Sequence, residues 1–217
     1  MKGLLIKDLR IVLKRKQSLL VLLGFCALIA FTADGSFVVA YSAGLTGIMG
    51  LSTFAYDSHD NGFPFLFSLP VDPKTYVTEK NLFCILSDLA GLAVGTVLFL
   101  IACAARGQMD VFREDLAYLL LYFPATLLLL FSTLLNQMIF GIEKSRVVTL
   151  VLYGLLFVVS AVIVKVVGPV GQDGAGRQMP EWMNNIFLIG SAFFVFVAVL
   201  CFGLYLISLR VMKNKEF

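Results

Sequence analysis

The chain has 217 residues, of which 59% are hydrophobic and only 14% are charged. Soluble domains carry about 25% charged residues, so this composition excludes a soluble globular protein and indicates a membrane protein. The net charge of +3 is small, and only the placement of the basic residues makes it informative. The four cysteines are scattered through apolar segments without metal-ligand or disulfide spacing, and we expect them to be packing residues.

Residues 1–17 predict an amphipathic helix that lies in the membrane interface. Its apolar residues share one helical face, and its charged residues turn elsewhere. The apolar group is Leu4, Leu5, Leu9, Val12 and Leu13, and the charged group is Lys7, Asp8, Arg10 and Lys14. The basic side chains would lie near anionic lipid headgroups, although a simple positive-inside anchor explains any single lysine equally well.

Residues 18–209 divide into six expected transmembrane helices, because about 20 apolar residues cross the hydrocarbon core. They are placed at 18–33, 36–55, 81–105, 115–140, 147–168 and 185–209. The loop 169–184 is rich in glycine and polar residues and is expected to cover the outer mouth, and residues 210–217 form a short tail. The predicted fold class is therefore an all-α polytopic membrane protein.

The distribution of basic residues predicts the orientation of these spans. Thirteen lysines and arginines fall on the side of the N-terminus, three fall on the other side, and Lys165 lies inside a span near its outer end. Under the positive-inside rule, both termini and the loop 56–80 should be cytosolic. A cytosolic protein could therefore reach that loop.

The loop 56–80, YDSHDNGFPFLFSLPVDPKTYVTEK, is the longest polar interruption between two apolar segments in the N-terminal half. Residues 56–62 are turn formers, and residues 63–69 form an apolar block far too short to span a bilayer. Pro70 disfavours helical backbone at the residue before it, and Asp72 supplies an N-cap before a proline at the first helical position. The pattern predicts a turn, a short apolar helix, a break and a new helix that starts at Pro73. This helix carries Lys74, Glu79 and Lys80 on its polar opening turns and runs into the third span.

This loop resembles the first cytosolic loop of ABC-2 type transporter permeases. The resemblance is carried by Tyr56-Asp57, the polar run to Asn61-Gly62, the segment FLFSLPV, Lys74, Tyr76-Val77 and Lys80, and it extends to the opening MKGLLIKDL. The nearest members are the short six-span permeases of Gram-positive bacteria, including those of phenol-soluble-modulin exporters. Many relatives place an acid directly after the Tyr-Asp pair, whereas this chain has Ser58 there and its second acid at Asp60.

The resemblance implies that the loop holds a coupling helix, which sits in a cleft of an ATPase subunit. The docking residues would be Phe63, Phe65, Leu66, Phe67 and Leu69, with Tyr56, Asp57 and Asp60 as polar clamps. The alternative is that these aromatic side chains simply lie in the lipid headgroup layer.

The resemblance also implies an assembly and an activity. It implies an exporter of amphipathic peptides or other hydrophobic compounds in the bacterial plasma membrane. Two ATPase subunits would supply ATP and Mg²⁺ chemistry, and a second permease, identical to the first, would complete the transporter. No cofactor, metal or nucleic acid is expected in this chain.

Polar and small residues at membrane depth are the remaining candidates. Asp88 lies about two turns into the third span, where a charge is costly. It either contacts substrate or a gate, or it hydrogen-bonds a neighbouring span. Gly44 and Gly47 in the second span and Gly91 and Gly95 in the third predict close helix contacts within the subunit or across a dimer, although membrane helices also tolerate glycine without such a role.

No enzymatic constellation is present in the sequence. His59 is the only histidine, which excludes catalytic arrangements built on two histidines or on a second one beside a nucleophile. The chain also has no G-x-x-x-x-G-K-[ST] motif, so it has no phosphate-binding loop of that kind, and the ATPase is expected in a separate polypeptide. The alternative function is a membrane scaffold or accessory subunit that binds partners without moving substrate.

Overall fold

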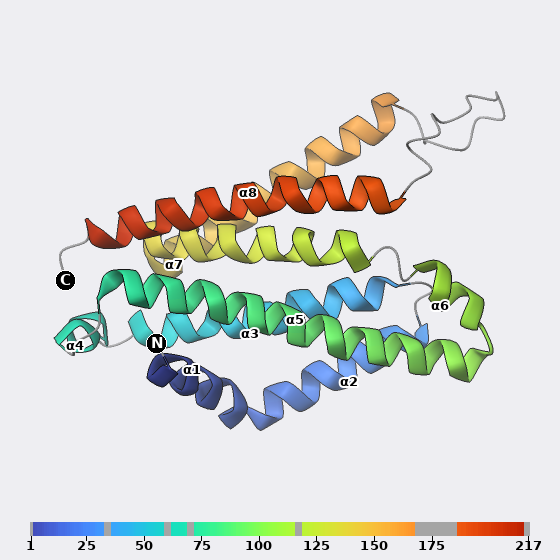
Figure 1. Cartoon of the computed structure of the whole chain (residues 1–217), viewed down its shortest axis with the longest axis horizontal. Helices are drawn as coiled ribbons and strands as arrows, with labels where there is room; N and C mark the ends of the chain where they lie inside the picture. The colour runs from blue at the N-terminus through green and yellow to red at the C-terminus, as the bar shows by residue number, and fades with distance from the viewer. Residues whose placement is uncertain are drawn as a thin grey trace.

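The computed structural model describes residues 2–32, 36–58, 62–68, 72–115, 119–167 and 186–214. Every regular element in these ranges is an α-helix, which agrees with the predicted all-α class. In chain order (Figure 1) the helices are α1 (Lys2–Lys14), α2 (Lys16–Thr32), α3 (Phe37–Ser58), α4 (Gly62–Ser68), α5 (Pro73–Arg106), α6 (Met109–Asp115), α7 (Leu119–Val167) and α8 (Ile186–Lys213).

The centre of the fold is the pair α3 and α5, which lie side by side (Figure 1). α7 packs on both of them, and α8 packs on α7 and α5. α1 and α2 meet at an elbow at Arg15, and both contact α3 and α5. The two N-terminal helices lie across the α3 and α5 pair from α8 (Figure 1).

Among the described residues, four helices are long and apolar enough to cross a membrane. These candidate spans are Phe37–Ser58, Pro73–Arg106, Leu121–Leu155 and Gly190–Lys213. α2, where the first span was expected, is apolar but has only 17 residues. The helices are consistent with a polytopic membrane protein, and the count of six spans stays a prediction. The outer loop 169–184 lies outside the described residues.

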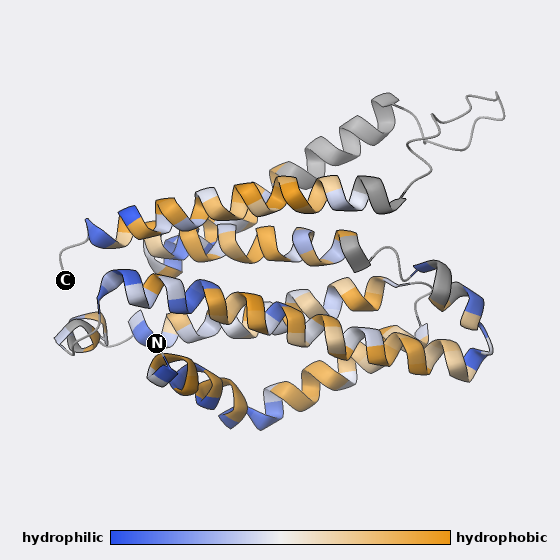
Figure 2. Cartoon of the chain, in the orientation of Figure 1, coloured by the Kyte–Doolittle hydropathy of each residue, from blue (hydrophilic) through white to orange (hydrophobic). Residues whose placement is uncertain are grey.

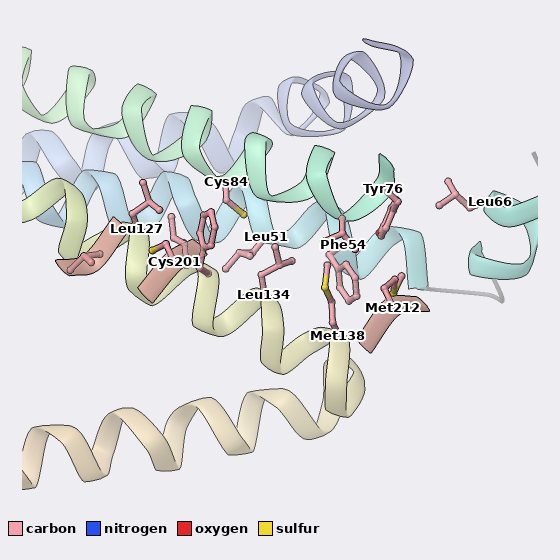
Figure 3. Packing of buried hydrophobic residues seen from close by; sticks show 14 residues of the cluster. Leu51, Phe54, Leu66, Tyr76, Cys84, Leu127, Leu134, Met138, Cys201 and Met212 are labelled. Atoms are coloured by element: carbon pink, nitrogen blue, oxygen red, sulfur yellow. The ribbon is translucent and has the colours of Figure 1, made fainter. Parts of the chain in front are cut away.

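α7 is interrupted at Gly141, whose backbone angles of φ 76° and ψ 174° are not helical. Glycine reaches a positive φ without strain because it has no Cβ. Beyond Gly141 the chain turns back along its own path (Figure 3), and the Tyr153 hydroxyl in the second arm donates a hydrogen bond to the Leu129 carbonyl in the first, at 2.9 Å. The predicted fourth and fifth spans, 115–140 and 147–168, meet at this break.

The largest buried cluster joins α3, α5, α7 and α8 (Figure 3). It contains Phe54, Tyr76, Leu134, Met138 and Met212, each at most 2% exposed. Apolar residues cover much of the long helices, and polar residues gather mainly toward their ends (Figure 2). This distribution suits a bundle with an outer surface that contacts lipid, because there the apolar side chains need no partner from the protein.

α5 begins at Pro73 as predicted, with Asp72 extended at the N-cap position, although the Asp72 side chain makes no capping hydrogen bond. The helix has 34 residues, which corresponds to about 51 Å at 1.5 Å per residue. The hydrocarbon core of a bilayer is only about 30 Å thick. Unless it is strongly tilted, α5 therefore extends beyond the hydrocarbon core.

The sequence pattern does not predict α6, which falls between the expected third and fourth spans. Asp115 was placed at the start of the fourth span, but it ends α6, and α7 starts only at Leu119. The reason is a tertiary contact: the Asp115 carboxylate accepts a hydrogen bond from the Ser36 backbone N–H at 2.9 Å. Arg106 donates to the Phe31 carbonyl at 2.5 Å. These contacts hold Ser36 beside α6 and the C-terminal end of α2 beside the end of α5.

Candidate functional site

Polar side chains from three helices meet near the two ends of the loop 56–80. Thr53 and Asp57 are four residues apart on α3, and Tyr76 and Lys80 are four apart on α5, so each pair lies on one helical face. Contacts between these faces and α1 bring the group together. We call it the polar cluster, and its members are Lys7, Asp8, Thr53, Asp57, Tyr76, Glu79 and Lys80.

Lys80 is at the centre of the polar cluster, with a side chain that is only 2% exposed. Its ammonium pairs with the Asp8 carboxylate, lies 2.7 Å from Asp57 Oδ2, and donates a hydrogen bond to Thr53 Oγ1 at 3.2 Å. Burying an ammonium without such partners costs several kcal/mol. The burial of Lys80 therefore depends on α1 and α3, and this one side chain joins them to α5.

Asp57 is engaged by three side chains of its own chain. Besides Lys80, it accepts a hydrogen bond from Lys7 Nζ at 2.5 Å and from the Tyr76 hydroxyl at 3.0 Å. Partial burial lowers the pKa of the Lys7 ammonium, but the hydrogen bond and charge of Asp57, together with the nearby Asp8 carboxylate, outweigh it, so this pKa is raised overall. The Asp57 side chain is only 7% exposed, so little of it is accessible for the predicted direct contact with an ATPase, and that role stays a prediction.

Asp8 and Glu79 are fully buried, which the sequence analysis does not anticipate. The helical pattern turns Asp8 away from the packed face of α1 and leaves Glu79 and Lys80 on polar opening turns. The structure corrects this: the ion pair across helices between Lys80 and Asp8 holds these two side chains inside, and Glu79 is buried next to them. Among the described residues, neither Glu79 oxygen has a hydrogen-bond partner, and Asp8 Oδ1 lies 3.4 Å from Lys7 Nζ without a hydrogen bond. If every group in the polar cluster is ionised, the carboxylates of Asp8, Asp57 and Glu79 outnumber the ammoniums of Lys7 and Lys80 by three to two.

One sequence feature could have indicated the site: Asp8 is the only acid in the otherwise basic segment 1–17. A lone acid among lysines suggests a specific partner more than a solvated face. The partner itself could not be identified from the sequence, because Asp8 and Lys80 are 72 residues apart.

The short helix α4 folds back against the end of α3. A Cβ at Gly62 would lie 2.4 Å from the Asp57 backbone oxygen, so a larger residue would displace α4. The Phe63 ring packs against Phe54 and Tyr76, with centroid separations of 5.5 and 6.0 Å. Leu66 is buried in the main core (Figure 3). Two of the predicted docking residues therefore contact the core of the chain itself.

Of the other predicted docking and clamp residues, the structure describes the side chains of Tyr56 and Asp57 only. Tyr56 is exposed, and the Arg15 guanidinium lies 4.7 Å from the centre of its ring. Phe65 and Phe67 belong to the α4 backbone, but their side chains are outside the described set, as are residues Asp60 and Leu69. Pro64 and Ser68 are exposed, so α4 also has an open face. The docking role of this helix stays a prediction.

Asp88 is buried in α5 and contacts a neighbouring helix. Its Oδ2 accepts a hydrogen bond from Thr126 Oγ1 of α7 at 3.1 Å, and Oδ1 has no hydrogen-bond partner among the described residues. The contact with Thr126 agrees with one of the two roles considered from the sequence, a hydrogen bond to a neighbouring span. A role in a substrate pathway stays a hypothesis.

Three of the four singled-out glycines lie where a side chain would collide with another helix. A Cβ at Gly91 would lie 2.7 Å from the Ala43 Cα, and one at Gly95 would lie 2.8 Å from the Val39 Cα. A Cβ at Gly47 would meet the Leu130 side chain at 2.5 Å. These contacts are within the subunit, between α3 and α5 or α7. A Cβ at Gly44 would meet nothing within 4 Å.

A cavity of about 480 Å³ opens between α5, α7 and α8. Its walls are mostly apolar and aromatic, with Phe123 and Phe194 among them, and its polar residues are Thr78, Asn81 and Tyr205. The Thr78 and Tyr205 hydroxyls are hydrogen-bonded to each other at 2.8 Å. The cavity therefore suits an apolar ligand more than a charged one.

The long apolar helices and the core between them define a polytopic α-helical membrane protein. A family model described as ABC-2 family transporter protein matches residues 3–213, and the chain belongs to this family of ABC-2 type transporter permeases. Comparisons with curated proteins and with solved structures found no match. Membership in the family makes the chain a membrane permease of an ABC transporter, the transmembrane component that associates with a separate ATPase subunit.

Proposed function

We propose that this permease is the membrane-spanning subunit of an exporter that moves amphipathic peptides or other hydrophobic compounds out of the cell. ATP bound with Mg²⁺ is hydrolysed in the ATPase partner. The observation that carries the proposal is the polar cluster, in which Lys80 of α5 is bound to α1 and to the end of α3. Any force on the loop between α3 and α5 therefore acts on a long membrane helix and on the N-terminal helix together.

In this mechanism α4 is the contact with the ATPase. Phe65, Phe67 and Leu69 dock in the partner, while Phe63 and Leu66 hold α4 to the protein. Because the Phe63 ring touches the Tyr76 ring, displacement of α4 moves the first turns of α5. α5 is an unbroken helix of 34 residues, so it transmits this displacement toward the far side of the membrane.

The apolar cavity between α5, α7 and α8 supports the proposed substrate class. A substrate with an apolar face can enter it without leaving a buried charge unpaired. A second, identical permease and a second ATPase would complete the transporter, in a bacterial plasma membrane with both permease termini in the cytosol.

The first test is co-purification of the chain with a co-expressed cognate ATPase subunit. The native chain should retain the ATPase, and the double variant Phe65→Asp with Phe67→Asp should lose it, because an acid in an apolar cleft is costly to bury. Lys144→Asp is the matched control, since it changes the net charge by the same amount at an exposed position of α7, outside the loop. Membrane insertion of each variant is checked separately.

Two outcomes would redirect the proposal. If the double variant and the control bind the ATPase equally well, α4 lies in the headgroup layer and is not the contact. If the ATPase binds but its turnover is insensitive to every amphipathic peptide tried, the scaffold alternative is favoured over transport.

A further inference from the structure

A second apolar groove lies between the N-terminal elbow and the central helices. It has a volume of about 460 Å³, and its walls come from α1 and α2 on one side and from α3 and α5 on the other. The wall residues are Leu5, Ile6, Leu9, Val12, Leu13, Leu19, Leu22, Leu23, Thr46, Met49, Phe83, Leu86, Ser87, Ala90 and Val94. Thr46 and Ser87 are the only polar residues among them, and the Thr46 hydroxyl already bonds the Ser42 and Ala43 carbonyls.

The length of the groove matches half of a bilayer. On α5 its wall runs from Phe83 to Val94, which is about 16 Å at 1.5 Å per residue. One leaflet contributes about 15 Å of the roughly 30 Å hydrocarbon core. The groove volume is also within the range of about 300 to 1,000 Å³ that is usual for small-molecule sites. An extended hydrocarbon chain from one leaflet fits these dimensions.

The elbow beside the groove carries positive charge. Lys14 directly follows the wall residue Leu13, and Lys16 lies three residues before the wall residue Leu19. Both lysines are exposed, and so is Arg10 on α1. Figure 2 shows hydrophilic residues at the junction of α1 and α2, next to the apolar length of α2. Basic residues beside an apolar groove at the membrane surface are the arrangement that recognises an anionic lipid headgroup.

We propose that this groove is a binding site for an anionic phospholipid, with one acyl chain between the N-terminal elbow and α5 and the headgroup on Lys14 and Lys16. A second copy of the chain is a poorer occupant. In a two-fold symmetric contact the same patch meets itself, so two basic elbows would face each other and repel. This site is independent of the ATPase contact and of the substrate cavity, which lies between α5, α7 and α8.

The test uses the full chain in nanodiscs of phosphatidylcholine with a titrated fraction of phosphatidylglycerol that carries a diazirine on one acyl chain. After irradiation, the labelled residues are mapped by mass spectrometry. We expect labels concentrated on groove residues such as Leu86 and Ala90. Ala90→Trp, which fills the groove from an exposed position, should reduce this labelling at least tenfold. The matched control is Ala93→Trp, which is also exposed on α5 but is not part of the groove wall, and it should leave the labelling unchanged.

A separate pair of variants tests the proposed contact between the lipid headgroup and the basic residues of the elbow. Lys14→Gln with Lys16→Gln should weaken the apparent affinity for phosphatidylglycerol by on the order of 30-fold, from about fivefold per basic side chain at an anionic surface. Lys144→Gln with Arg146→Gln removes the same charge from two exposed residues of α7 and should have no such effect. Equal labelling by a phosphatidylcholine probe would overturn the headgroup assignment. Labels spread evenly over lipid-facing residues such as Val97 and Leu150, or a cross-link between two chains through the groove, would overturn the site.

Discussion

The Lys80 ammonium lies 2.7 Å from the Asp57 carboxylate, and neither side chain is more than 7% exposed. This pair joins the two ends of the loop that carries α4, because Asp57 is one of the last residues of α3 and Lys80 lies in the second turn of α5. The loop is therefore closed by a buried ion pair at its base. Movement of α5 relative to the end of α3 would have to break this pair.

Replacing Lys80 should destabilise the chain strongly. Lys80→Met removes the buried cation between Asp8 and Asp57 and leaves them with the more exposed Lys7. Removing one partner of a buried ion pair costs about 3 to 5 kcal/mol. Thermal unfolding of the purified chain in detergent measures the effect. Exposed Lys144→Met is the control, and its unfolding temperature should match that of the native chain. An unchanged unfolding temperature for Lys80→Met would show that the pair contributes little.

Glu79→Gln should raise the stability of the chain or leave it unchanged, in contrast to Lys80→Met. The native carboxylate is buried without a hydrogen-bond partner among the described residues, beside the acids that Lys7 and Lys80 already balance. An amide of the same shape removes a charge that is costly to bury. We expect the free energy of unfolding to stay equal or rise by about 1 kcal/mol. A loss comparable to that of Lys80→Met would instead mean that Glu79 is a paired member of the cluster.

Gly91→Ala should loosen the contact between α3 and α5, because its Cβ would lie 2.7 Å from the Ala43 Cα and 2.8 Å from the Ser42 carbonyl oxygen. These are backbone atoms and cannot rotate away, so we expect a loss of about 1 to 3 kcal/mol in the free energy of unfolding. Gly44→Ala is the matched control, since its Cβ meets nothing within 4 Å. There the better helix propensity of alanine should give no loss or a gain of up to about 1 kcal/mol. Equal effects at both positions would argue against close packing at Gly91.

Asp88→Asn separates the two roles considered for this residue. The amide oxygen can still accept the hydrogen bond from Thr126, and the variant no longer buries a charge. The unfolding temperature should therefore not fall. If Asp88 serves the substrate pathway, stimulation of the cognate ATPase by an amphipathic peptide should drop although the protein remains stable. Native stimulation together with native stability would leave Asp88 with a structural role only.

The sequence was sufficient for the features that depend on local chemistry. The apolar composition predicted a membrane protein, and Asp72 followed by Pro73 predicted where α5 begins, because proline at the first helical position needs no hydrogen-bond donor. The polar interval between 140 and 147 predicted a separation between two apolar segments, and the chain reverses at Gly141 within it. The Tyr56-Asp57 motif and the segments around it indicated the ABC-2 family that the chain belongs to.

Only the tertiary structure decided which polar residues are buried. Helical periodicity turned Asp8 away from the apolar face of α1, and Glu79 and Lys80 were expected on the polar opening turns of α5. These side chains lie inside because α1, α3 and α5 converge there. Periodicity records how a residue lies relative to its own helix, and it contains no information about a partner 72 residues away. The groove at the N-terminal elbow has the same origin, since its walls come from four helices. The sequence by itself determined the all-α membrane class, the start of α5 and the family. The packing between distant elements determined the polar cluster and the groove, because their residues come from three and four different helices.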